Sequence, residues 1–324
     1  MRRLRANLCY ALAATAALAA CPPLSAQQYP AKPVKMVVAQ PPGGANDHFG
    51  RLIAQRLTTG LGQQVIVENK SGAGGLIGIE AGVKSPPDGY TLTLIGGSYT
   101  IFPSLYKLNF DPVTDITPII QIAQAPLFVV VHPSLPVTTT RDLIALAKAK
   151  PGKLNFASAG QGSMPHLAAE LFASMAGIKM NHVPYRGGGP MVMDTIAGRT
   201  DLFFASSATA MQNVRAGKLR VIAVTASQRH DAVPDVPTVA ESALPGYEVV
   251  NWFGLVGPKG LPRPIVDRIN AEVTITLKSS ETGERLQVDG SSPAGGTPEQ
   301  FTAIIKRDIE LWRKVVREAG VKPE

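Results

Sequence analysis

The chain is poor in cysteine and in charge. Its 324 residues include two cysteines, and Asp, Glu, Lys and Arg together make up 17%. Cys9 and Cys21 belong to or adjoin an N-terminal leader, so a chain exported by cleavage after Ala26 has no disulfide, no CxxC redox pair and no thiol nucleophile. The low charge and the 45% of hydrophobic residues are typical of a globular protein with a sizeable core and exclude a disordered chain. At this length we expect two domains.

The first 26 residues predict a secretory signal peptide. Three arginines within the first five positions precede the apolar run Leu8–Ala20, which is too short to span a bilayer stably. Two cleavage sites fit. Cleavage after Ala26 would release a soluble periplasmic protein, whereas the string LAAC ending at Cys21 resembles a bacterial lipobox and would make Cys21 a lipidated N-terminus. We favour the soluble form, because one short lipobox match can arise by chance in an alanine-rich leader.

The positive charge does not indicate a nucleic-acid partner. The formal net charge of +8 falls by three, to +5, when the three arginines of the leader are removed. Spread over the rest of the chain this is a mild bias, and we expect no nucleic-acid binding. No later segment reaches 18 consecutive apolar residues, so the sequence predicts no other membrane anchor.

After the leader, short β-branched runs alternate with longer helical runs, a pattern typical of an α/β fold. The run Leu127–Val131 is apolar throughout, as expected for a strand buried on both faces. Further strands are expected at Val34–Ala39, Gln64–Glu68, Tyr90–Ile95, Leu154–Ser158, Leu202–Phe204 and Leu219–Thr225. Helices are expected at Asp47–Gly60, Arg141–Lys150, His166–Ala176, Pro190–Ile196, Pro264–Lys278 and Pro298–Ala319. The glycine-rich segment Ser71–Gly78 is interpreted as a turn.

Two strand-to-helix junctions carry most of the chemical information. In the first, Pro41–Gly44 precedes a helix that starts near Asn46 or Asp47; in the second, Ser158–Ser163 precedes the helix at His166. Unpaired N–H groups of a first helical turn point outward at such a junction, and glycine lets a ligand approach the backbone closely. Glycine-rich turns also join strand to helix in most α/β proteins, so either loop alone has an ordinary structural explanation. Together they predict a ligand with two acidic ends.

Other ligand classes and catalysis have little support. Neither loop is followed by the GK[ST] of a nucleotide site, and the dinucleotide pattern fails at Pro165. The five histidines show no metal-ligand spacing, and GxSxG is absent. A Ser/His/Asp triad stays open, since its members need not be adjacent in sequence. We expect no enzyme, no cofactor and no metal.

Several side chains near the loops allow two interpretations. Asp47 is expected to be structural, capping the helix and pairing with Arg51 one turn on, with binding of an ammonium group or a bridging water as the alternative. His166 is either a donor to an anion or a packing residue. In the string VPYRGGG, Arg186 either pairs a carboxylate bidentately or is a solvated surface residue.

From Tyr29 onward the chain closely resembles the substrate-binding proteins of tripartite tricarboxylate transporters, the Bug or TctC family. The matching strings are PPGGANDHFGRLIAQRL, VIVENKSGAGGLIGIEAG, PPDGYTLTL, LNFASAGQGSMPHLAAELF, HVPYRGGGP, GKLRVIAVTASQRHDAVPDVPTVAES and NWFGLVGPKGLP, in the family's order. The resemblance implies a type II periplasmic binding protein fold, in which two doubly wound α/β lobes joined by two crossing strands close on a ligand. We place lobe 1 at residues 27–126 plus 248–324 and lobe 2 at residues 127–247.

The resemblance also implies a set of ligand-binding residues. Gly43 and Gly44 would hold one carboxylate through backbone N–H groups and ordered water, with Asp47 and Ser98 nearby. The other carboxylate would be held from lobe 2, by Ser158, Gly162, Ser163 and His166 with Tyr185, Arg186 and Gly187 close by. Many relatives have Lys in place of Arg186, and the arginine favours a planar bidentate contact if its side chain reaches the ligand. Many also have Asp in place of Ala205, and the absence of an acid there favours plain carboxylates over amino acids.

The expected function is therefore capture of a small carboxylate, a di- or tricarboxylate, by a monomeric periplasmic protein that delivers it to membrane permease subunits. A sensor that presents the closed, carboxylate-bound form to a signalling receptor is the alternative. An exported hydrolase is the third hypothesis, and turnover of ester or amide substrates would reveal it.

Overall fold

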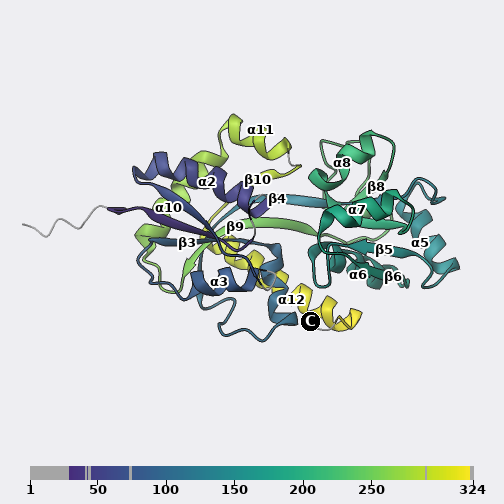
Figure 1. The fold of residues 1–324 in the computed structure, drawn as a ribbon, viewed down its shortest axis with the longest axis horizontal. Helices are drawn as coiled ribbons and strands as arrows, with labels where there is room; N and C mark the ends of the chain where they lie inside the picture. Colours follow the sequence, from purple (N-terminus) through teal and green to yellow (C-terminus); the bar gives the residue numbers. More distant parts are fainter. Residues whose placement is uncertain (1–28, 41, 43–44, 73–74, 289, 322–324) are drawn as a thin grey trace, which may run out of the picture.

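The computed structural model describes residues 29–321, except positions 41, 43, 44, 73, 74 and 289. Figure 1 shows two α/β lobes joined by two long strands, β4 (Ile116–Val131) and β9 (Val250–Pro258). The expected signal peptide and the lipidation site at Cys21 lie outside the described residues, as do Gly43 and Gly44. These expectations therefore stay predictions.

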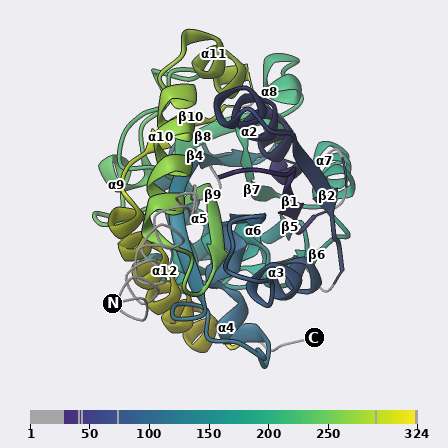
Figure 2. The same ribbon diagram turned by 90° about the vertical axis from the view of Figure 1, so that its left-hand side faces the viewer.

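The first lobe is a mixed sheet with helices on both faces. Its strands lie in the order β2 (Val65–Asn69), β1 (Val34–Val38), β3 (Thr91–Gly96), β9, β4 and β10 (Ser292–Gly295). Strand β1 is parallel to β2 and β3, and β3 is antiparallel to β9. Helices α2 (Ala45–Leu61) and α10 (Arg263–Leu277) cover one face, and α3 (Leu76–Val83) and α12 (Pro298–Ala319) cover the other, above and below the sheet in Figure 2. The lobe also contains the 3-10 helix η2 (Gly97–Thr100), α4 (Phe102–Leu105) and α11 (Ser280–Val288).

Helix α2 forms because its apolar residues recur at a helical spacing. Phe49, Ile53 and Leu57 follow one another at intervals of four and are all buried in the core between α2, α10 and the sheet. The sequence predicts this amphipathic stripe, and the structure confirms it.

The second lobe is also built around a mixed sheet, and three of its strands are parallel to one another. Its strands lie in the order β8 (Arg220–Val224), β4, β7 (Leu202–Ser206), β5 (Asn155–Ser158) and β6 (Asn181–Pro184). Strand β5 is parallel to both β6 and β7, and β4 is antiparallel to β7 and β8. The helices are α5 (Thr140–Ala149), α6 (Met164–Ala176), α7 (Gly188–Ile196), α8 (Ser207–Arg215) and α9 (Val239–Ser242).

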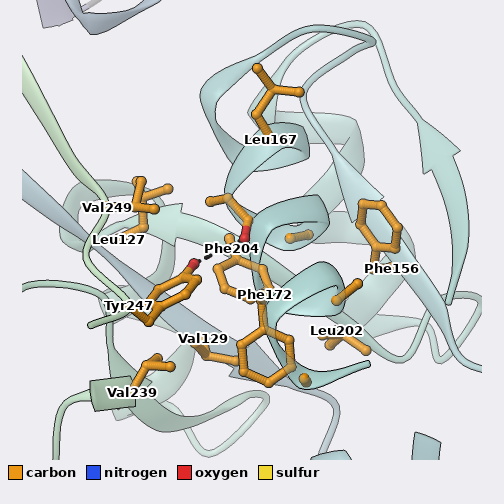
Figure 3. Packing of buried hydrophobic residues seen from close by; sticks show 14 of the residues in the cluster. Leu127, Val129, Phe156, Leu167, Phe172, Leu202, Phe204, Val239, Tyr247 and Val249 are labelled. Carbon is orange, nitrogen blue, oxygen red and sulfur yellow. Dashed lines mark hydrogen bonds between the residues drawn. The ribbon is translucent and has the colours of Figure 1, made fainter. Parts of the chain in front are cut away.

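Aromatic side chains fill the core of the second lobe. Phe172 of α6 packs against Phe204 of β7 and against Tyr247, with ring centroids 5.7 and 6.1 Å away (Figure 3). The buried hydroxyl of Tyr247 donates to the carbonyl of Ala168 at 2.9 Å, so this polar atom is paired inside the core. The bond ties the segment that leads into β9 to helix α6.

The two connecting strands are antiparallel partners until they reach the second lobe. Their pairing runs from Ile116 opposite Pro258 to Pro126 opposite Val250. Beyond that point Thr225 stands between them: its Oγ1 accepts from the Leu127 N–H at 2.7 Å and donates to the Val249 carbonyl at 2.6 Å. This buried hydroxyl fixes the separation of the two strands where they enter the second lobe.

Helix α12 is a third connection between the lobes. Phe301, Ile305 and Ile309 on its first half pack in the first lobe, whereas Trp312 and Val316 on its second half belong to the core of the second lobe. In Figure 1 the helix runs from beneath one lobe to beneath the other. The predicted limits of the lobes, 27–126 with 248–324 and 127–247, stay a prediction, because α12 contributes to both cores.

A buried hydrogen bond joins α12 to a connecting strand. The indole Nε1 of Trp252 on β9 donates to Asp308 Oδ2 at 2.7 Å, and Arg307 Nε lies 2.8 Å from the other oxygen of this carboxylate. Asp308 is 5% exposed, so these two partners compensate the carboxylate for the water that burial removes.

The residue pattern gives no bounds for β6, β9, β10, α4, α8, α9 or α11. Of the thirteen strands and helices that it does predict, twelve lie within two residues of their observed bounds. Leu127–Val131, however, is only the last part of β4, whose first part contains Pro118 and two glutamines that obscure the strand pattern. The interpretation of Ser71–Gly78 as a turn is wrong for its last three residues, which open α3. Glycine lowers helix propensity, but a Cβ on Gly78 would lie 2.4 Å from the Lys70 carbonyl, so close packing of α3 requires it.

The Trp252–Asp308 bond gives a testable stability difference between two matched substitutions. Trp252→Phe and Trp312→Phe remove similar ring volume, but the Nε1 of Trp312 has no hydrogen-bond partner among the described residues. We expect Trp252→Phe to lower the free energy of unfolding by about 1.5–3 kcal/mol more than Trp312→Phe, the range for a hydrogen bond to a charged group. Urea denaturation of both variants measures the difference; equal losses would show that the bond contributes nothing.

Candidate functional site

Three helices of the second lobe begin side by side without a side-chain cap. Helices α6, α7 and α8 follow the carboxyl ends of β5, β6 and β7, and their N-cap residues, Ser163, Gly187 and Ser206, make no capping hydrogen bond from a side chain. By contrast, α5, α9 and α12 each carry a complete capping box. Because β5, β6 and β7 are parallel, the three open helix ends meet at one edge of the sheet, where an anion would find N–H donors and favourable helix dipoles.

The loop between β5 and α6 is held by bonds among its own residues. Ser158 Oγ accepts from the Gly160 N–H at 3.1 Å, and Ser163 Oγ donates to the Gly160 carbonyl at 2.6 Å. The Gly162 N–H donates to His166 Nδ1 at 3.0 Å. Gly160 and Gly162 have φ of +134° and +70°, values that a residue with a Cβ rarely adopts. Four predicted site residues thus meet here: Gly162 and His166 bond to each other, and Ser158 and Ser163 both bond to Gly160.

Two imidazoles lie in face-to-face contact beneath this loop. The rings of His166 and His182 are 3.8 Å apart and within 9° of parallel, and Phe156 stacks on His182 at 4.8 Å. The Nε2 of His166 lies 3.6 Å from Oε1 of Glu170. His182 Nε2 is 2.7 Å from Ser158 Oγ. Burial, and then the neighbouring His166, lower the pKa of His182 to about 4.

The third predicted loop lies directly beside the second. The Tyr185 N–H donates to the Ser158 carbonyl at 3.0 Å and the Gly187 N–H to the Ala159 carbonyl at 3.1 Å. The Tyr185 hydroxyl donates to Asp194 at 2.9 Å; burial and this bond raise the pKa of the phenol.

Arg186 is the predicted cation of this loop. Its side chain is exposed, and it makes no ion pair with any residue of the described ranges. Gly187 adopts φ of +104° and has open space where a Cβ would stand. The loop thus offers a positive charge and an accessible backbone beside the start of α7.

The first lobe meets these loops through glycines. A Cβ on Gly97, next to the predicted residue Ser98, would lie 2.8 Å from Met164 Cε at the start of α6 and 2.8 Å from Asn251 Oδ1. A Cβ on Gly162 would lie 2.3 Å from Leu105 Cδ1 of α4. The two lobes therefore approach each other at the open end of α6, beside the chain neighbour of Ser98, and a contact between Ser98 and a ligand stays a prediction.

The carboxylate of Asp47 is hydrogen-bonded to side chains of the first lobe. It accepts from Arg51 Nε at 3.0 Å and from Asn69 Nδ2 at 2.9 Å, and Asn69 also donates to the Gln40 carbonyl. The predicted pair with Arg51 is confirmed, and the predicted cap of α2 by Asp47 stays a prediction. These bonds tie the first turn of α2 to the ends of β1 and β2, and a contact between Asp47 and a ligand stays a prediction.

Sequence reasoning missed three polar residues at this junction. Asn46 lies against Gly96, Asn251 against Gly97, and His182 beneath the second loop. Asn46 stands beside the PPGG loop in the sequence, and Asn251 directly precedes the buried Trp252, but nothing in the pattern separates them from ordinary polar residues.

Two lobes that meet at glycine-rich, uncapped helix ends define a two-lobed solute-binding protein.

Comparison with known proteins identifies the family. Residues 49–321 match the family described as "Tripartite tricarboxylate transporter family receptor". Protein BugT of Bordetella pertussis is 38% identical over 312 residues, which cover 95% of each chain. A Rhodopseudomonas palustris protein solved with adipate is 36% identical, with a TM-score of 0.79 over 91% of this chain and all of that one. MatC from the same organism, solved with bound malate, is 30% identical, with a TM-score of 0.74 over 89% of this chain and all of that one.

The chain belongs to the tripartite tricarboxylate transporter receptor family, also called the Bug or TctC family. Its fold is the two-lobed α/β fold of type II periplasmic binding proteins, and its relatives are solute receptors rather than enzymes. Within the described residues, no helix is both long and apolar enough to cross a membrane, and no cluster of three His, Cys, Asp or Glu residues could hold a metal ion.

The depressed pKa of His182 predicts a loss of stability in mild acid. The unfolded histidine takes up a proton near pH 6.5 and the folded one only near pH 4, so the unfolded state binds more protons between these values. The contribution of this pKa shift to the free energy of unfolding is complete above pH 6.5 and is lost progressively as the pH falls toward 4. His182→Gln removes this titration, so the urea midpoint of the variant should fall less than that of the wild type between pH 6.5 and pH 4.5. Parallel pH profiles of the two proteins would contradict the shift.

Proposed function

We propose that this receptor captures a small di- or tricarboxylate between its lobes and delivers it to the membrane permease subunits of a tripartite tricarboxylate transporter. The observation that carries the proposal is the convergence of three uncapped helix N-termini at one edge of the second lobe, where the start of α6 lies against Gly97 of the first lobe. Such ends attract negative charge and supply several N–H donors at once.

Two features support a dicarboxylate in particular. Relatives of similar length have been solved with adipate and with malate, which are both dicarboxylic acids. In this chain the exposed Arg186 adds a positive charge beside the open helix ends of the second lobe, where it can pair with one carboxylate. Position 205 in β7 is a buried alanine. It therefore supplies no carboxylate that could pair with the ammonium group of an amino acid.

Thermal unfolding with a panel of acids tests the proposal. The exported chain, residues 27–324, is heated with adipate, malate and citrate, and with a neutral sugar and a diamine as controls. A ligand present at 100 times its dissociation constant adds about 2.7 kcal/mol to the free energy of unfolding. We expect at least one acid to raise the melting temperature and neither control to do so. If the sugar or the diamine stabilises the protein and no acid does, the anion site is wrong.

A wedge between the lobes tests capture by closure. Gly97→Val places methyl groups against Met164 and Asn251, so the lobes should no longer approach fully, and affinity for the acid found in the panel should fall about tenfold or more. Gly283→Val on α11 is the control, because a Cβ there has no neighbour within 4 Å. Calorimetric titration compares the two; equal affinities would mean that the bound state does not use this contact.

A further inference from the structure

We infer that His182 is a positioning residue of the binding site: it holds Ser158, and through Ser158 the loop 158–163, in the shape that presents the open end of α6. The inference rests on the proposed function and adds to it a residue that touches no ligand.

The first link is the buried hydroxyl of Ser158. This side chain is fully buried, and its Oγ lies 3.1 Å from the Gly160 nitrogen, 3.0 Å from the Gly160 oxygen and 2.7 Å from His182 Nε2. The backbone N–H and the carbonyl of Gly160 thus both hydrogen-bond to one oxygen, Ser158 Oγ. The bond from this oxygen to the His182 imidazole sets its position. The contact with His182 connects this oxygen to β6, a strand outside the loop.

The second link is the immobility of the His182 ring. It is stacked against His166 at 3.8 Å and against Phe156 at 4.8 Å, so rotation about its side-chain bonds would break both stacks. His166 in turn accepts the Gly162 N–H at 3.0 Å. The loop is therefore tied at Gly160 through His182 and at Gly162 through His166, and the two ties meet in one pair of rings.

The loop needs this support because its backbone is unusual. Gly160 and Gly162 both have positive φ, and glycine has many alternative conformations available when nothing holds it. A loop that is ordered before binding spares the ligand the cost of ordering it. Loss of the His182 bond should therefore weaken binding, although His182 lies under the loop.

The pair of rings also has a defined charge environment. His182 faces His166 of α6 and the uncharged Phe156 and Ser158 of β5, and the acidic group near the pair is Glu170, which lies 3.6 Å from His166. A proton on His182 would place a cation 3.8 Å from the His166 ring, and burial and this neighbour lower the pKa of His182. Binding experiments are best done near pH 7.5, where the ligand's carboxylates are also ionised.

The experiment is a double-mutant cycle in the full exported chain, titrated with adipate and with malate. His182→Phe keeps an aromatic ring for stacking but removes the bond to Ser158, and Ser158→Ala removes the other partner. We expect each to weaken binding about tenfold, and the double variant to be no weaker than the weaker single variant, since both break one link. His182→Gln restores a nitrogen near the position of Nε2 and should recover most of the affinity.

A role in packing alone predicts a different pattern. The melting temperature of His182→Phe would fall while its affinity stayed that of the wild type, or the losses in the double variant would add. Either result overturns the inference.

Amide hydrogen exchange without ligand provides a second readout. The Gly160 and Gly162 amides should exchange about tenfold faster in His182→Phe than in the wild type, and the amide of Leu57 in α2 of the first lobe should not change. Unchanged exchange at both glycines would overturn the positioning role. If the wild type binds neither acid while the two glycine amides respond as expected, the proposed function fails for these acids and the support of the loop by His182 stands.

Discussion

The ligand-binding side of this protein depends on one constraint: an α-helix begins with N–H groups that have no partner within the helix. Helices α5, α9 and α12 satisfy some of them with threonine capping boxes, whereas α6, α7 and α8 begin without such a cap. An absent cap typically costs about 1 kcal/mol of stability. Because β5, β6 and β7 are parallel, all three uncapped ends lie at the same edge of the sheet. The fold is thus locally less stable where a small anion can supply the missing acceptors.

Much of this arrangement could be predicted from the sequence, because it follows from short-range rules. Alternating β-branched and helical runs define the α/β class, and glycine-rich turns after strands mark the junctions. The contacts among the loop residues could not be predicted in the same way. Gly162 and His166 were expected to hold a carboxylate, yet they bond to each other, and His182 reaches Ser158 from a strand 24 residues later in the chain. Such pairs arise from the order of strands in the sheet, which periodicity does not encode.

The connection between the lobes is more than a pair of strands. Thr225 sets the spacing of β4 and β9 where they enter the second lobe, and α12 lies across both cores. The bond from Trp252 to Asp308 joins α12 to β9 between these two contacts. A rotation of one lobe relative to the other must therefore bend α12 or shift it against one core, which restricts the motion to a small set of directions.

The composition of the chain places its own optical probe at this junction. Trp252 and Trp312 are its two tryptophans. One indole is hydrogen-bonded at the middle of α12, and the other lies a single turn further along the helix, inside the second lobe. Indole emission depends on the polarity and the hydrogen bonding around the ring. The tryptophan fluorescence of the unlabelled protein therefore comes entirely from the place where the two lobes are joined.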